Sequence, residues 1–152
     1  MTGWRVGYLL ADVSLVPNMA KIQEGIVSCV PAFLQIAAAE ALTRTDCVEQ
    51  MREEYACRDI LIDGINAIPG FSCKKSTGSF YAFVNIKAFG KTSEEFAEEL
   101  IRNADVVTVP GSAFSKMGGG YLRLVFANSD ENLQEAVKRI GDYVHNAYPN
   151  LK

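Results

Sequence analysis

The sequence predicts an α+β fold in which a layer of short strands is covered by helices. From about residue 45 onward, the patterns run in the order helix, two strands, helix, two strands, helix. Of the 152 residues, 49% are hydrophobic and 22% are charged, as in ordinary globular proteins. A chain of this length can bury a core without disulfides or metals. Short strand pairs of this kind pack against helices laid on one face.

The first third of the chain predicts one strand and two helices. Residues 4–10 (WRVGYLL) are apolar enough for a strand, and residues 16–24 have the spacing of a short helix. Pro31 stands at the start of a second helix, residues 32–42, where its missing N–H costs nothing. We expect this alanine-rich helix to be well buried, because its apolar character exceeds that of a helix facing solvent.

A charged amphipathic helix follows, and it marks a boundary between two parts of the chain. Thr45 and Asp46 provide an N-cap, and apolar residues recur every three or four positions as far as Asn66. Pro69 and Gly70 then stop the helix. The change of character near residues 43–46 predicts a division into residues 1–45 and residues 46–152.

The remainder reads as short strands and two capped helices. Thr92 and Glu95 have the spacing of a capping box, and the helix that they start is expected to bury Phe96, Leu100 and Ile101. Ser129 caps a last helix. The three glycines at 118–120 predict a flexible loop tip, since they do not precede a helix as a phosphate-binding loop would. Strands are expected at residues 71–74, 79–86, 106–109 and 121–126.

Composition excludes several classes of function. The chain has 15 Lys and Arg against 18 Asp and Glu, so it lacks the basic surface of a nucleic-acid binder. No apolar run approaches the length of a membrane span, and no secretory leader is visible, so we expect a cytoplasmic protein. A metal site is not expected, because the four cysteines form no CxxC pair and His145 is the only histidine. The same single histidine argues against a Ser-His-Asp triad.

Two arginines are the candidate binding residues. Arg5 and Arg123 each interrupt an apolar segment, where a guanidinium must find an anion or bear a large desolvation cost. The planar guanidinium binds carboxylate or phosphate through two parallel hydrogen bonds. A site built from both arginines would therefore take a doubly anionic ligand. The alternative for each is a structural ion pair with a nearby carboxylate.

Several segments together resemble the class I aminotransferases, the pyridoxal-phosphate enzymes related to aspartate aminotransferase. Residues 107–114 (VTVPGSAF) and 120–124 (GYLRL) are among the most specific of these matches. In residues 55–59 (YACRD), Cys57 stands where the family often has a second arginine. The other matching segments are residues 1–8 (MTGWRVGY), 31–42 with Gln35, 68–71 (IPGF) and 78–83 (GSFYAF).

The resemblance implies a fold, a reaction and two site residues. Residues 1–45 would be the tail of the large cofactor-binding domain, and residues 46–152 the small C-terminal domain of a fold-type I enzyme. The parent enzyme would transfer an amino group between an amino acid and a 2-oxo acid. Because the apolar residues of segment 1–45 would normally pack on other parts of the large domain, we expect this chain to form a homodimer or another homo-oligomer, or the residues before about Asp46 to rearrange against the small domain. In this family Arg5 would bind the phosphate of pyridoxal phosphate, and Arg123 the α-carboxylate of the substrate.

The resemblance also implies that the Schiff-base lysine is missing. The family places it shortly before the arginine matched by Arg5, and neither Lys21, Lys74 nor Lys75 occupies that position. We therefore expect no catalytic residue here, no bound cofactor and no activity from this chain alone. Two alternatives stay open: a non-catalytic regulatory domain that binds an amino acid or small anion, and a structural piece for dimer contacts.

Overall fold

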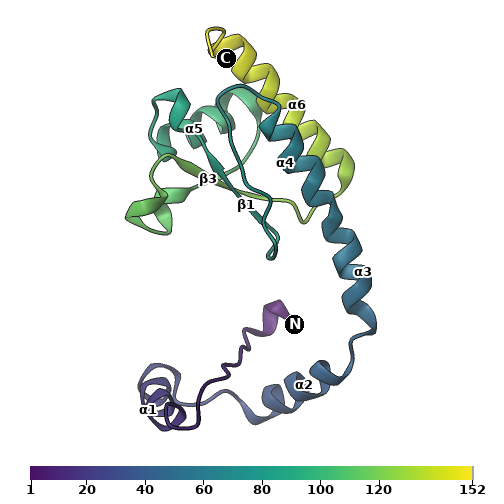
Figure 1. The fold of residues 1–152 in the computed structure, drawn as a ribbon, viewed down its shortest axis with the longest axis vertical. Coiled ribbons are helices and arrows are strands. Elements are labelled where there is room, and N and C mark those ends of the chain that lie inside the picture. The colour runs from purple at the N-terminus through teal and green to yellow at the C-terminus, as the bar shows by residue number, and fades with distance from the viewer. Residues whose placement is uncertain (152) are drawn as a thin grey trace. The chain divides into compact units, whose positions relative to one another are not determined.

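The computed structural model describes residues 1–151, apart from the side chain of Thr2 (Figure 1). Contacts divide the chain into two compact units, Met1–Gln50 and Met51–Lys152, and each is described by itself. No helix in the described part of the chain has the length and apolar character needed to cross a bilayer.

The first unit is helical, with an irregular start. A 3-10 turn, η1 (Thr2–Trp4), is followed by irregular backbone, so the expected strand at residues 4–10 is wrong. Arg5 has a φ of 54°, in the left-handed region that strands do not use. The two expected helices are confirmed as α1 (Val16–Val27) and α2 (Ala32–Thr43).

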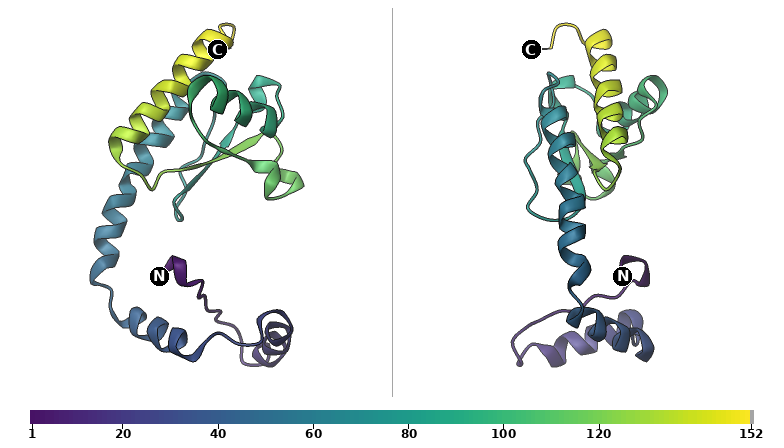
Figure 2. Two further views of the ribbon diagram at one scale, coloured as in Figure 1. Left: turned by 180° about the vertical axis from the view of Figure 1, so that it is seen from behind. Right: turned by 90° about the vertical axis from the view of Figure 1, so that its right-hand side faces the viewer.

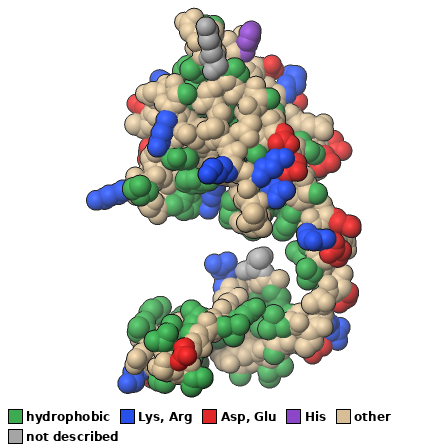
Figure 3. Space-filling model, viewed as in Figure 1, with side chains coloured by type: hydrophobic (Ala, Val, Ile, Leu, Met, Phe, Trp, Pro, Cys, Tyr) green, Lys and Arg blue, Asp and Glu red, His purple; other side chains and the backbone are tan. Residues whose placement is uncertain are grey.

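The expected burial of α2 is also wrong. Neither α1 nor α2 contains a buried residue, and Phe33 and Ile36 are 67% and 71% exposed. In Figure 3, hydrophobic side chains stand at the surface of this first unit. The apolar residues of α2 are distributed around its whole circumference, a pattern that is typical of a helix enclosed by other elements. None of the described residues within Met1–Gln50 encloses it.

The long helix expected from Thr45 to Asn66 is confirmed with one interruption. It consists of α3 (Asp46–Glu54), a single 3-10 turn η2 (Tyr55–Cys57) and α4 (Arg58–Asn66). The buried thiol of Cys57, the last residue of η2, donates a hydrogen bond to the carbonyl oxygen of Phe126 at 2.9 Å. This bond joins the helix to the segment that follows the last strand.

The second unit contains a three-stranded antiparallel sheet in the order β1-β3-β2, of which Figure 1 labels β1 and β3. Its strands are β1 (Tyr81–Asn85), β2 (Val109–Pro110) and β3 (Tyr121–Val125). The strands expected at residues 79–86 and 121–126 are thus confirmed. Residues 71–74 contribute only one bridge, Ser72 to Asn85, and of residues 106–109 only the last belongs to a strand.

Helices cover one face of this sheet. Burial alternates along β1 and β3, with Ala82, Val84, Leu122 and Leu124 buried against α4, α5 (Ser93–Ala104) and α6 (Asp130–Ala147). Figure 2 shows α4 and α6 side by side. This arrangement confirms the α+β class. The opposite face is open, and Tyr81, Phe83, Tyr121 and Arg123 lie on it.

Two of the three expected helix caps, those at Thr92 and Ser129, are confirmed. The hydroxyl of Thr92 accepts a hydrogen bond from the Glu95 amide, and the Glu95 carboxylate accepts one from the Thr92 amide. The Ser129 hydroxyl accepts one from the amide of Asn132 at the start of α6. Within α5, Phe96 and Leu100 are buried as expected, but Ile101 lies on the outer side and is half exposed.

Candidate functional site

Arg123 lies in the middle of the open face of the sheet. It belongs to the central strand β3, where its backbone is opposite Phe83 of β1 on one side and Val109 of β2 on the other. Its neighbours Leu122 and Leu124 point into the core. Strand alternation therefore directs the Arg123 side chain away from the helices.

Two aromatic rings contact the Arg123 guanidinium. Its Cζ atom lies 4.2 Å from the ring centre of Tyr81 and 4.3 Å from that of Phe114. Its Nε atom is buried and has no hydrogen-bond partner. In the described part of the chain no carboxylate pairs with Arg123, so the structural ion pair considered above is not present there. Arg123 is a cation packed on aromatic rings, with no anionic partner among the described residues.

The loop that carries Phe114 is closely packed. The turns η4 (Gly111–Ala113) and η5 (Lys116–Gly118) meet at their glycines, because a Cβ on Gly118 would overlap the carbonyl of Gly111. Gly118 is buried, and the Ser93 hydroxyl donates to its carbonyl oxygen at 3.3 Å. Of the loop tip expected at residues 118–120, Gly118 is thus packed in place, whereas Gly119 is exposed. Close backbone packing accounts for Gly111 and Gly118.

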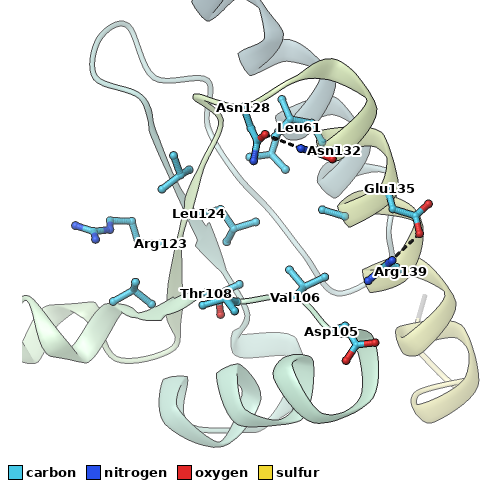
Figure 4. Close-up of a pocket in the computed structure, with 15 residues that line it drawn as sticks. Leu61, Asp105, Val106, Thr108, Arg123, Leu124, Asn128, Asn132, Glu135 and Arg139 are labelled. Atoms are coloured by element: carbon cyan, nitrogen blue, oxygen red, sulfur yellow. Dashed lines mark hydrogen bonds and ion pairs between the residues drawn. The ribbon is translucent and has the colours of Figure 1, made fainter.

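A separate hollow of about 470 Å³ lies between the β2–β3 edge of the sheet and α6. Figure 4 shows that Arg123 extends away from the other labelled residues of this hollow. Arg139, also in the lining, is already paired with Glu135 at 2.8 Å. The Arg123 guanidinium therefore lies on the open face of the sheet and not in this hollow.

Arg5 belongs to the first unit, and Arg123 to the second. Arg5 is exposed and follows the 3-10 turn η1, so it does not have the apolar strand setting that the sequence suggested. An exposed guanidinium remains suited to binding a phosphate.

The family model for aminotransferase class I and II matches residues 1–140. The chain belongs to this family. It is 41% identical over 144 residues to an aspartate aminotransferase of Pyrococcus horikoshii, and 43% identical over 147 residues to the putative aminotransferase YugH of Bacillus subtilis. These matches cover 92% and 95% of the chain but only 37% and 38% of the relatives. The chain thus spans well under half the length of the curated relatives that it matches.

A solved structure gives the same picture for the fold. The crystal structure of an aromatic aminotransferase from Pyrococcus horikoshii OT3 superposes with a TM-score of 0.83 at 38% identity. The superposition covers 97% of this chain and 40% of that chain. The aminotransferase resemblance read from the sequence motifs is confirmed.

In this aminotransferase chain, sequence reasoning did not single out the residues that contact Arg123. Tyr81 falls within the strand expected at residues 79–86, and Phe114 within the family-matching segment 107–114. Period-two alternation could have placed Tyr81 and Phe83 on one face, because residues two apart in a strand point the same way. No comparable signal connects Phe114 to Arg123, since the contact depends on how the loop folds back.

Proposed function

We propose that the protein takes part in the transfer of an amino group between an amino acid and a 2-oxo acid, with pyridoxal phosphate as the cofactor. We place this reaction in the cytoplasm. In this proposal Arg123 binds the α-carboxylate of the substrate. One observation carries the assignment of Arg123. Its guanidinium lies on the open face of the sheet without a carboxylate partner among the described residues. A guanidinium without a carboxylate partner can bind an external anion, and its planar shape matches that of a carboxylate.

We further propose that residues 1–45 form the end of the large cofactor-binding domain and residues 46–152 the small domain. The donor set fits the cofactor's anionic group, because Arg5 is exposed and a guanidinium binds phosphate through two hydrogen bonds. Arg5 would hold that phosphate. When bound, pyridoxal phosphate supplies the electron sink for chemistry at the substrate Cα.

The contribution of Arg123 would be binding and orientation. Two hydrogen bonds to the carboxylate fix the substrate against rotation, which directs its Cα–H bond toward the base that removes the proton. Fixing a reactant in this way contributes to catalysis without any proton transfer by the arginine itself. Arg123 is therefore a substrate-binding residue in this proposal.

The catalytic lysine is not supplied by these 152 residues in our proposal. Lys21, Lys74 and Lys75 lie outside the motif position, so the chain alone should bind no cofactor and should be inactive. Mixing it with pyridoxal phosphate and borohydride should give only scattered surface adducts. A single stoichiometric adduct at one lysine, accompanied by transamination, would contradict this.

The activity itself can be tested in a chimera. The C-terminal part of the Pyrococcus horikoshii aspartate aminotransferase is replaced by this chain, to which it is 41% identical. We expect the chimera to bind the cofactor and to transaminate. A folded, cofactor-loaded chimera without activity would contradict the proposed reaction. If the chain nevertheless bound acetate at Arg123, the non-catalytic anion-binding alternative would account for the site.

Association with another protein chain is the remaining part of the proposal. The first unit exposes many large apolar side chains, including Trp4, Tyr8, Phe33 and Ile36. Contiguous exposed apolar surface favours association, which supports a homodimer or another homo-oligomer. Analytical ultracentrifugation of the chain tests this, and a monomer at all concentrations would contradict it.

A further inference from the structure

We propose that Tyr81 and Phe114 are positioning residues, which hold the Arg123 guanidinium so that its two terminal nitrogens face a carboxylate end-on. The inference rests on the proposed function, in which Arg123 binds the α-carboxylate of the substrate. It adds two residues and a binding geometry to that site. We refer to the rings of Tyr81 and Phe114 together as the aromatic clamp.

The topology brings the two rings to Arg123 from different sides. Arg123 lies on the central strand β3. Tyr81 belongs to β1, which pairs with one edge of β3, and Phe114 follows β2, which pairs with the other edge. The two rings lie at nearly equal distances from Cζ, 4.2 and 4.3 Å. Aromatic faces attract a guanidinium at this range.

The burial of Nε decides which nitrogens can reach a ligand. An arginine can bind a carboxylate through Nε and one terminal nitrogen, or through both terminal nitrogens, Nη1 and Nη2. In Arg123 the Nε atom is buried among protein atoms and has no partner. A carboxylate therefore has access to the Nη1–Nη2 edge only. Stacking the guanidinium on two rings limits rotation of this edge, which lowers the ordering cost of binding.

The exposure of Phe114 is hard to explain by core packing. Its side chain is 51% exposed, although a phenylalanine that stabilises a core is normally enclosed. Its backbone is nevertheless fixed, because its amide donates to the Gly111 carbonyl at 3.0 Å and Gly111 packs directly against Gly118. A ring held in place at the surface, with a cation against it, is suited to orienting that cation.

Phe83 provides a matched control. It lies on the same open face as Tyr81, two residues along β1, and is opposite Arg123 in the strand register. Its ring stacks on Tyr121 with centres 5.2 Å apart, and it is 42% exposed. Phe83→Leu therefore removes an aromatic ring from this face without removing one from the clamp.

The test uses the whole 152-residue chain and ¹⁵N–¹H spectra of arginine Nε–H groups. The wild type, Phe114→Leu, Tyr81→Leu and Phe83→Leu are each titrated with sodium acetate at constant ionic strength. Ring currents should displace the Arg123 Nε–H signal in the wild type. We expect each clamp variant to move this signal toward that of a free arginine and to weaken acetate binding about three- to tenfold. Phe83→Leu should do neither.

The outcomes separate this inference from the proposed function. Acetate binding that is lost in Arg123→Lys but unchanged in both clamp variants would overturn the positioning role and leave the carboxylate site standing. Equal weakening by Phe83→Leu would overturn it as well, because the effect would then belong to the whole face. If wild-type acetate binding did not depend on Arg123, the carboxylate site and the positioning role would both be wrong. Phe114 is half exposed, so Phe114→Leu should fold even if Tyr81→Leu does not.

Discussion

The side-chain oxygen of Ser93 accepts a hydrogen bond from the backbone amide of Tyr121 at 3.2 Å. The same oxygen accepts one from the Gly120 amide at 3.0 Å and donates to the Gly118 carbonyl. One buried hydroxyl at the start of α5 thus fixes the backbone that leads into β3. Because Arg123 lies two residues further on, this hydroxyl helps to set the position of the candidate site.

We predict that Ser93→Ala destabilises the second unit. The substitution leaves two amide donors and one carbonyl without their partner, and unsatisfied buried groups of this kind cost about 1–3 kcal/mol. Urea unfolding followed by circular dichroism measures the loss. Ser115→Ala on the neighbouring loop is the control, because Ser115 is exposed. Equal midpoints for the two variants would show that the Ser93 bonds contribute nothing net.

We predict that Gly118→Ala is poorly tolerated, whereas Gly119→Ala is nearly neutral. A Cβ on Gly118 would overlap the Gly111 carbonyl, which is backbone and cannot rotate away. Overpacking of this kind costs about 1–3 kcal/mol. At Gly119 the nearest atom to a new Cβ is the carbonyl oxygen of Lys116, at an ordinary 3.7 Å. Thermal unfolding of the pair is the measurement, and a Gly118→Ala midpoint at or above that of Gly119→Ala would contradict the prediction.

The elements that the sequence predicted correctly are those with a local cause. The Thr92 capping box depends only on residues three apart, and α6 follows directly from Ser129 and its apolar spacing. Such signals are complete within one segment. The α+β class follows from their order.

The errors concern features that depend on distant partners. Residues 4–10 are apolar, but a strand also needs a partner, and Arg5 instead adopts a left-handed backbone. Val106 does not belong to the expected strand, because its amide donates a hydrogen bond to the carbonyl oxygen of Leu100 in the last turns of α5. Likewise, the sequence identifies Arg123 as an anomalous cation in an apolar strand, but the contact between Phe114 and Arg123 could not be predicted from it. Contacts across loops and between strands decide these features.

The Glu99 carboxylate should make stability depend on pH. It accepts hydrogen bonds from Tyr148 at 2.6 Å and Tyr143 at 2.8 Å, and pairs with Lys91 at 2.8 Å. Burial, the largest single influence, raises its pKa. The bonds from Lys91 and the two tyrosines together outweigh burial, so the net pKa lies below the usual value of 4.5. Folding therefore favours the charged form.

The sign of the effect follows from this lowered pKa. The stabilisation is fully present above the unfolded-state pKa near 4.5 and is lost as the pH falls through the lower folded-state pKa. We predict that Glu99→Gln lowers the free energy of unfolding by about 1–2 kcal/mol at pH 7. The difference in unfolding free energy between the variant and the wild type should shrink below pH 4.5. Urea unfolding at a series of pH values measures both. The control Glu98→Gln affects an exposed pair with Arg102, which should contribute little.

Arg123→Lys separates substrate binding from a structural role. Lysine keeps the charge but lacks the two parallel donors, so the chimera carrying this variant should lose about 1.5–3 kcal/mol in kcat/KM. The unfolding free energy should change by only about 0.5–1 kcal/mol, the scale of a cation–π contact, because no described carboxylate is left unpaired.

Arg139→Lys is the matched control, since that arginine pairs with Glu135 on α6 and points to the hollow. It should leave kcat/KM unchanged. A large loss of stability in Arg123→Lys with intact kcat/KM would mean that Arg123 supports the fold, and the substrate carboxylate would then have to be bound elsewhere.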